Sequence, residues 1–132
     1  EIEQELGLLG DKDVQITFTA QVVPVCRGIM SSLYASLDGQ SADAILELYR
    51  EFYRNQPFVR VFDAKTPVSI ADVRGTNYCN LTVDVDQRNN RLRVISHIDN
   101  LMKGQASNAL QNMNLMFGFD QETALAAPGQ YP

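Results

Sequence analysis

The stretch CNLTVDVDQRNNRLRVISHI, residues 79–98, decides the fold. Apolar and polar residues alternate at a period of two on both sides of the tetrapeptide at 87–90. Such alternation is typical of a strand with one buried face, and two such runs around a short polar loop predict a hairpin. The outer face places two aspartates of the first strand opposite two arginines of the second: Asp84, Asp86, Arg91 and Arg93. This charge match favours the pairing.

The sequence on either side of the hairpin predicts three further strands and three helices. Strands are expected at 14–21, 29–37 and 58–62, and helices at 1–9, between Ser41 and Pro57, and at about 103–117. Residues 63–76 are expected to be irregular. Strands that pair mostly through hairpins favour an α+β fold, in which a mostly antiparallel sheet carries helices on one face.

One domain accounts for residues 1–118, and residues 119–132 form a tail without periodicity. The first helix has acidic residues in its first turn, which suits a helix N-terminus. No capping residue precedes Glu1, however, and we therefore expect the chain to be a piece of a longer one.

Composition limits the function classes. The chain has 132 residues, of which 45% are hydrophobic and 20% charged, and its formal net charge is −5. An acidic surface is unsuited to a phosphate backbone, so we expect no nucleic-acid binding. No apolar run approaches the roughly 20 residues of a membrane span, and no secretory signal opens the chain. We therefore expect a cytoplasmic protein that binds no membrane.

The cysteines and the single histidine form no recognisable motif. Cys26 and Cys79 have neither metal-ligand spacing nor a disulfide pattern, and we expect both to be reduced, buried side chains. His97 falls on the outer face of the hairpin, where an exposed histidine is expected rather than a catalytic one. No phosphate-binding loop and no G-x-G-x-x-G are present. These residues predict neither a metal site nor a self-sufficient catalytic set.

A cation stands in a turn between two expected strands. Arg27 precedes Gly28 in the segment PVCRG, and its guanidinium could bind a carboxylate or a phosphate through two parallel hydrogen bonds. The alternative is a surface arginine beside a turn, and the spacing alone does not separate the two.

A second polar corner, DNLMKG at 99–104, joins the end of a strand to the start of a helix. Its backbone N–H groups and Lys103 could receive an anion or a carboxamide. The alternative is an ordinary helix cap made by Asp99 or Asn100.

Five segments in a fixed order resemble one family. They are EIEQEL at 1–6, FT at 18–19 followed by VPVCRGI at 23–29, VRGTNYC at 73–79, DNLMKG at 99–104 and QNMN at 111–114. Together they resemble the C-terminal half of the N-acetyl-γ-glutamyl-phosphate reductase family, over nearly the whole chain up to about Leu125. Aspartate-semialdehyde dehydrogenase and, more distantly, glyceraldehyde-3-phosphate dehydrogenase are relatives of that family.

The resemblance implies an NADPH-dependent reductase of arginine biosynthesis. Such an enzyme converts N-acetyl-γ-glutamyl phosphate to N-acetylglutamate semialdehyde through a cysteine thioester. In the family, the nucleophilic cysteine and the catalytic histidine lie upstream of the position of Glu1. The chain would then be the substrate and dimerisation domain, with a fold like the C-terminal domain of glyceraldehyde-3-phosphate dehydrogenase. It would be inactive alone, would form a homo-oligomer through its sheet, and would pack its last helix, 103–117, on a dinucleotide-binding domain.

The resemblance also implies roles for individual residues, none of them catalytic. Arg27 and Gln21 would contact the acidic substrate, and Asn100, Lys103 and Gly104 would lie near the nicotinamide end of NADP. The family usually has Pro-His where this chain has Ala20-Gln21. A glutamine can hydrogen-bond but cannot titrate, and this departure leaves a second interpretation open. That interpretation is a stand-alone α+β dimerisation or small-acid-binding module without catalysis.

Overall fold

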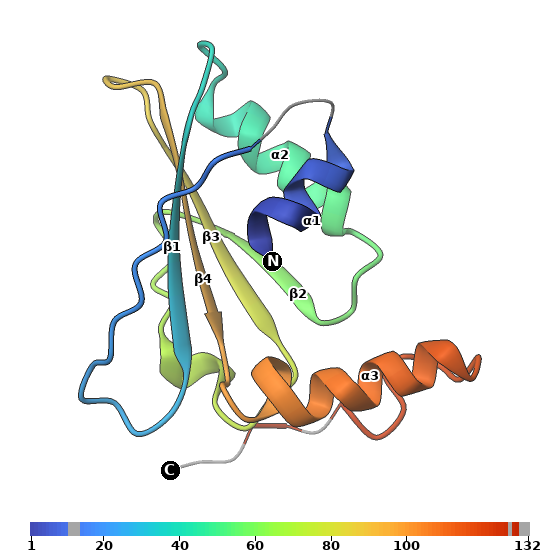
Figure 1. The fold of residues 1–132 in the computed structure, drawn as a ribbon. Coiled ribbons are helices and arrows are strands. Elements are labelled where there is room, and N and C mark those ends of the chain that lie inside the picture. The colour runs from blue at the N-terminus through green and yellow to red at the C-terminus, as the bar shows by residue number, and fades with distance from the viewer. Residues whose placement is uncertain (11–13, 127, 130–132) are drawn as a thin grey trace.

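A computed structural model of the chain describes residues 1–10, 14–126 and 128–129. Four strands form one sheet in the order β1-β4-β3-β2 (Figure 1). The strands are β1 (Ile29–Ser36), β2 (Val59–Asp63), β3 (Cys79–Asp86) and β4 (Arg91–Ile98). The helices are α1 (Ile2–Leu9), α2 (Ala42–Tyr53), the 3-10 helix η1 (Ile70–Val73), the π-helix η2 (Met102–Ala106) and α3 (Ser107–Met116).

The expected hairpin is confirmed as β3 and β4. Asp84 pairs with Arg93, and Asp86 with Arg91, in the antiparallel register of the two strands. The Arg93 guanidinium also forms an ion pair with Asp84. β1 continues the antiparallel pairing on the other side of β4, while β2 runs parallel to β3. The sheet is therefore mostly antiparallel, as expected for this α+β fold.

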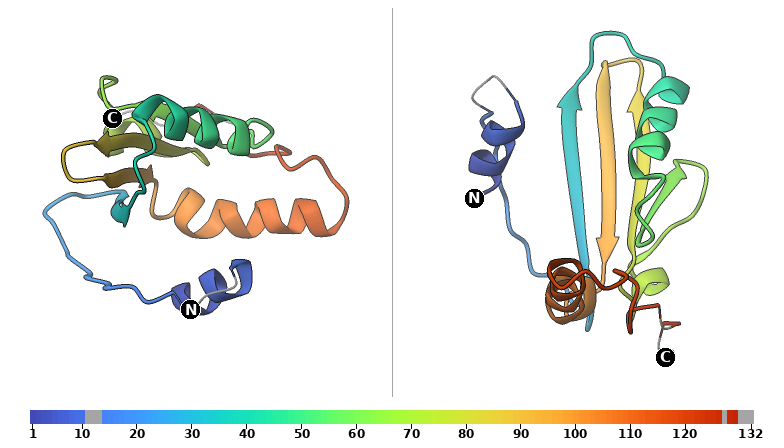
Figure 2. Two further views of the ribbon diagram at one scale, coloured as in Figure 1. Left: turned by 90° about the horizontal axis from the view of Figure 1, so that it is seen from above. Right: turned by 90° about the vertical axis from the view of Figure 1, so that its right-hand side faces the viewer.

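Helix α2 builds the core on one face of the sheet. The Ser41 hydroxyl accepts a hydrogen bond from the Ala44 N–H at 3.2 Å and caps the helix start. Ile45 is buried against Val83 and Val85 of β3. In Figure 2, α2 runs beside β3, which leaves β1 at the far edge of the sheet without a helix over it. Burial of these apolar side chains stabilises the hairpin on the α2 side.

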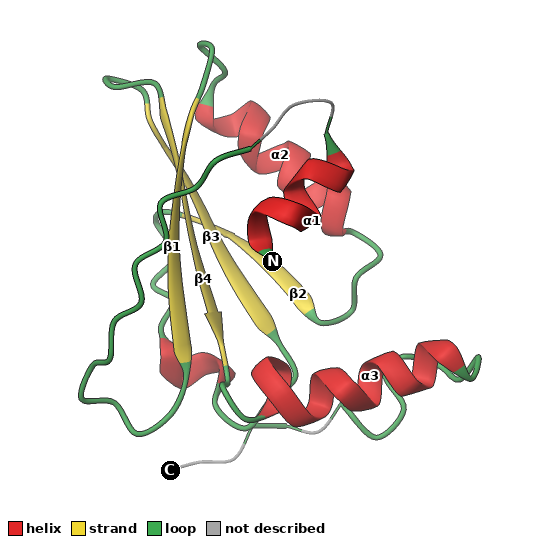
Figure 3. Cartoon of the chain, in the orientation of Figure 1, coloured by secondary structure: helices red, strands yellow, loops and turns green. Residues whose placement is uncertain are grey.

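The prediction of a strand at 14–21 is wrong. The structure gives these residues no strand pairing, and Figure 3 draws the whole stretch as loop. Phe18, on the apolar side of the pattern, is 73% exposed. The period-two pattern does describe a segment suited to pairing, but a strand also needs a neighbour for its N–H and C=O groups. No such neighbour lies along it among the residues that the structure describes.

The expected first helix is present but packs on little. None of the residues of α1 is buried, and the helix lies apart from the sheet in both views of Figure 2. One hydrogen bond links it to the following segment: the Ile16 N–H donates to Glu3 Oε1 at 2.8 Å. Helix α1 and the unpaired segment 14–21 therefore both leave apolar side chains exposed.

His97 is not exposed, contrary to expectation. Only 6% of the residue is accessible, although it points away from the α2 face. The short helix η1, for which an irregular segment was expected, packs against β4. Periodicity along β4 could not predict this cover, because η1 comes from a distant part of the chain.

Among the helices described here, none has the length and apolar character that crossing a membrane requires.

Candidate functional site

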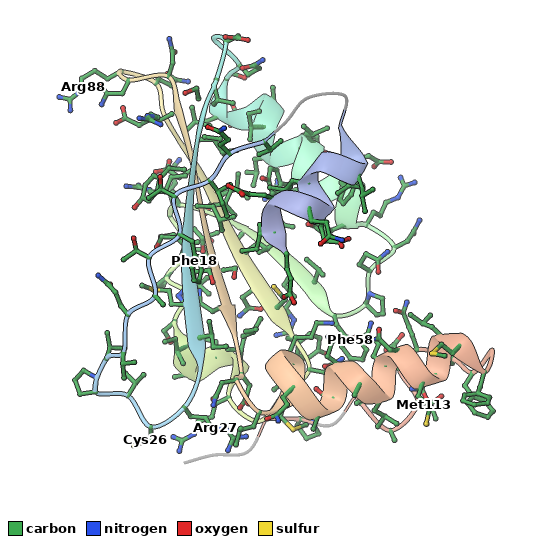
Figure 4. The ribbon with its side chains drawn as sticks, viewed as in Figure 1. Phe18, Cys26, Arg27, Phe58, Arg88 and Met113 are labelled. Carbon is green, nitrogen blue, oxygen red and sulfur yellow. The ribbon has the colours of Figure 1, made fainter. Side chains whose placement is uncertain are left out.

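The two polar corners expected from the sequence lie together. Arg27 Nε is 3.2 Å from Asp99 Oδ2, and Nε and Nη2 each donate to Oδ1 at 3.3 Å. The Asp99 side chain is fully buried, whereas 32% of the Arg27 side chain is exposed. Figure 4 shows Arg27 just before the start of β1, beside the start of the helix that leads into α3. The turn arginine is therefore held by a buried carboxylate and not left as an isolated surface charge.

Asp99 collects backbone hydrogen bonds from three further residues. The Gly75 N–H donates to Oδ2 at 2.7 Å, and the Leu101 and Met102 N–H groups donate to Oδ1 at 2.8 Å. Burial alone would raise the pKa of the Asp99 carboxyl, but these N–H groups and Arg27 outweigh it and lower that pKa. Asp99 is therefore a buried carboxylate anion at neutral pH.

The segment 99–104 acts as a helix cap, the alternative left open above. Besides the two N–H groups taken by the Asp99 carboxylate, the Gly104 N–H donates to the Asp99 carbonyl at 2.9 Å. This bond spans five residues, which makes the first turn π-helical. These paired groups do not form a cradle for an anion. π-turns are frequent at functional sites, where they reposition side chains.

Asn100 locks the two corners to each other. Its Oδ1 accepts a hydrogen bond from the Gly28 N–H at 2.7 Å. Gly28 has a φ of +108°, and a Cβ there would lie 2.0 Å from Ile70 Cγ2. The turn that carries Arg27 therefore depends on a residue without a side chain. The Nδ2 group of Asn100 makes no hydrogen bond among the residues described.

Lys103 is half-buried beside α3. Its Nζ donates to Gln111 Oε1 at 2.7 Å and lies 5.9 Å from the centre of the Phe58 ring. Burial lowers the pKa of the Lys103 ammonium, against an opposing effect of the nearby Cys79. One polar contact with an amide leaves this ammonium capacity for a further acceptor.

A buried polar network behind Lys103 was missed in the sequence. The Ser107 hydroxyl donates to Asn77 Oδ1 at 2.6 Å, and Asn77 Nδ2 donates to Gln111 Oε1 at 3.1 Å. Gln111 Nε2 reaches Gln121 Oε1 at 3.1 Å. The signal was the amide-rich composition of the last helix, in which Gln111 and Asn114 are buried. The network fixes α3 to the loop before β3 and to the segment after α3.

Gln21 and the cysteines lie outside this cluster. Gln21 is exposed in the unpaired segment, and no hydrogen bond joins it to Arg27 in the part of the chain that the structure describes. Cys26 is exposed, so its expected burial is wrong. It follows Pro24 in a stretch, 21–26, that is exposed throughout. Cys79 is partly buried, and burial raises the pKa of its thiol.

The histidine cannot act with Cys79. Asn80 is the strand partner of His97, so the neighbouring Cys79 projects from the opposite face of the sheet. Burial lowers the pKa of His97, against a raising effect of Asp72 on η1. The imidazole is therefore neutral at neutral pH. Cys79 and His97 therefore do not form a cysteine–histidine pair.

Comparison with known proteins gives a consistent picture. Residues 1–100 match the family model described as "Semialdehyde dehydrogenase, dimerisation domain". Over the whole chain, it is 47% identical to the N-acetyl-gamma-glutamyl-phosphate reductase of Pelotomaculum thermopropionicum. It is 48% identical to the protein of the same name from Geobacter metallireducens. The chain spans 38% of the length of each of these relatives.

A solved structure shares the fold. Aspartate semialdehyde dehydrogenase II from Vibrio cholerae superposes with a TM-score of 0.54 at 22% identity. The match covers 73% of this chain and 29% of that one. A longer chain therefore contains this α+β arrangement as one part of its structure.

Proposed function

The chain belongs to the semialdehyde dehydrogenase dimerisation domain family, and from this premise we propose that it is the substrate and dimerisation domain of an NADPH-dependent reductase. The proposed reaction converts N-acetyl-γ-glutamyl phosphate to N-acetylglutamate semialdehyde in arginine biosynthesis. Two relatives of that name, at 47% and 48% identity over the whole chain, support the substrate class. The observation that carries the proposal is the ion pair with the buried Asp99 carboxylate, which fixes Arg27 beside the start of η2.

In the proposed reaction, this domain binds the substrate and does not supply the reacting groups. In the proposed reaction a thiolate attacks the acyl carbon, phosphate leaves, and the resulting thioester is reduced. NADP, when bound in its reduced form, supplies the hydride for that reduction. The thiolate and its acid/base partner come from residues outside this chain. Arg27 binds the acidic group of the substrate, and Gln21 contributes a hydrogen bond from the segment that leads to it.

Three residues near η2 fit the nicotinamide end of NADP. Asn100 Nδ2 is a donor for a carboxamide oxygen, since only the Oδ1 of this side chain is used within the described residues. The Lys103 ammonium has donor capacity beyond Gln111. Gly104 is exposed, so a flat group can reach its backbone, although the side on which a Cβ would lie packs against the Asp99 carbonyl, 3.1 Å from that position.

Helix α3 is proposed to pack on the dinucleotide-binding domain of the full-length enzyme. Large apolar side chains at its end are more than half exposed: Leu115, Met116, Phe117 and Phe119. Such a patch is typical of an interface.

We also propose a cytoplasmic location. Both cysteines are free in the structure, and an exposed thiol such as Cys26 persists in a reducing compartment.

Replacing Arg27 with alanine in the full-length enzyme tests the proposal. We expect kcat/KM for the acyl phosphate to fall between about tenfold and about 150-fold, because a charge-assisted hydrogen bond is worth about 1.5–3 kcal/mol. Arg54→Ala is the matched control, since Arg54 pairs with the exposed Glu51 at 3.1 Å. An Arg27→Ala enzyme with the kcat/KM of the Arg54→Ala enzyme would remove Arg27 from the substrate site.

The family is one of dimerisation domains, and we propose that this chain forms a homo-oligomer through the sheet face that α2 does not cover. Met30 and Tyr34 of β1 lie on that face and are 57% and 64% exposed. A double change, Met30→Asp with Tyr34→Glu, is expected to convert the full-length enzyme to a monomer in sedimentation at micromolar concentration. Leu48→Asp on the exposed side of α2 is the control and should leave the oligomer intact. An oligomer that survives the double change would place the interface elsewhere.

A further inference from the structure

We infer that Asp99 is a positioning residue, which fixes the guanidinium of Arg27 so that its outer edge meets the anionic group of the substrate. The inference rests on the proposed function, because it concerns the same site. It adds a residue that touches no substrate and acts through another side chain.

The first step is the geometry of the ion pair. A guanidinium carries five N–H donors in a rigid plane. Asp99 takes the donor on Nε and one donor on Nη2, both at 3.3 Å from Oδ1, and its Oδ2 lies 3.2 Å from Nε. Nη1 and the second Nη2 hydrogen make no hydrogen bond with the residues described. Of these three remaining N–H groups, the one on Nη2 and one of the two on Nη1 lie parallel on the outer edge, which is the edge that matches a carboxylate or a phosphate.

The second step is that Arg27 is partly open to solvent. The Arg27 side chain is 32% exposed, although its partner carboxylate is completely buried. Because the buried Asp99 holds the inner edge, we infer that the unused donors lie on the exposed side of the arginine. A ligand arriving from solvent therefore finds two N–H groups already aligned, and loses less free energy to ordering the side chain.

The third step is that the Asp99 carboxylate itself cannot turn. Its two oxygens are fixed by the Gly75 N–H from the loop after η1 and by the Leu101 and Met102 N–H groups from the start of η2. Asn100, the next residue, holds the Gly28 N–H and thus the backbone beside Arg27. The guanidinium plane is therefore set by three separate chain segments.

A helix cap alone does not require a carboxylate. An asparagine at position 99 could still accept the Leu101 and Met102 N–H groups on Oδ1. Its Nδ2 would then face the Gly75 N–H and lie near Arg27 Nε, where only an acceptor is suitable, and its neutral Oδ1 would be a weaker acceptor for the guanidinium than a carboxylate is. Asp99→Asn therefore keeps the cap and removes the negative charge that pairs with the arginine.

A double-mutant cycle in the full-length enzyme tests the inference. We expect Asp99→Asn to lower kcat/KM for the acyl phosphate by about tenfold or more, mainly through a higher KM. In an Arg27→Ala background the same change should cause no further loss, because it acts through Arg27. An Asp99→Asn enzyme with wild-type KM, or losses that multiply in the double variant, would overturn the positioning role.

Arg27→Lys tests the same point with Asp99 left in place, in case Asp99→Asn does not fold. A lysine ammonium would pair with Asp99 and offer no second aligned edge. We therefore expect Arg27→Lys to lose nearly as much kcat/KM as Arg27→Ala, and a Lys variant close to wild type would overturn the inference. If Arg27→Ala itself leaves kcat/KM unchanged, the proposed substrate role of Arg27 fails, and the positioning role falls with it. A loss in Arg27→Ala with near-wild-type activity in Arg27→Lys overturns the positioning role alone.

Discussion

The isolated 132-residue chain is expected to reduce N-acetyl-γ-glutamyl phosphate with NADPH no faster than a buffer control, while the full-length enzyme turns over. Thioester chemistry needs a thiolate with an acid/base group beside it. Cys79 and His97 fail as such a pair on geometry, because they project from opposite faces of the sheet. Burial also raises the pKa of the Cys79 thiol and lowers that of His97. Both shifts oppose a thiolate–imidazolium pair.

The measurement is steady-state oxidation of NADPH by equal amounts of the isolated chain and the full-length enzyme. Circular dichroism on the isolated chain confirms that it is folded. The control is the isolated chain with Cys26→Ser, because Cys26 is the more exposed thiol. Turnover by the isolated chain that disappears in this control would give Cys26 a catalytic role and contradict the assignment.

The second large effect is expected from Gly28→Ala, which should lower the free energy of unfolding by about 3 kcal/mol or more. A left-handed backbone costs a residue with a side chain about 1–2 kcal/mol, and overpacking adds about 1–3 kcal/mol. At Gly28 both apply, since φ is +108° and the new Cβ would lie 2.0 Å from Ile70 Cγ2. The change would also displace the N–H that Asn100 accepts and, with it, Arg27.

Gly39→Ala provides the control for backbone strain. Gly39 also has a positive φ, +80°, but a Cβ there would meet nothing within 4 Å. We expect this variant to lose only about 1 kcal/mol in denaturant-induced unfolding and to keep its kcat/KM. Equal losses of unfolding free energy in the two variants would show that the contact with Ile70 does not constrain the turn.

Local patterns predicted the elements whose partners are close in sequence. The hairpin and α2 follow from alternation and from a helical stripe with a Ser41 cap, both of which are visible within a few residues. The segment 14–21 has the same alternation yet forms no strand, because pairing depends on a neighbour that a local pattern cannot supply. The parallel pairing of β2 with β3 was invisible for the same reason.

In the candidate site too, local roles could be predicted from the sequence, whereas contacts between distant segments could not. Arg27 stood out in the sequence as a cation in a glycine-containing turn, and Asp99 as a cap, and the structure gives each a matching local role. Their contact joins residues 72 positions apart, which no spacing argument predicts. The burial of His97 under η1 and the network around Asn77 likewise depend on distant segments. Only the unusual amide content of α3 hinted at that network.

The most direct test of the proposed reductase is an assay of the native polypeptide that contains this chain, purified from its own cells. With N-acetyl-γ-glutamyl phosphate and NADPH, we expect NADPH oxidation that requires the acyl phosphate and releases an equal amount of inorganic phosphate. A folded native polypeptide that oxidises no NADPH with this substrate would contradict the proposed function.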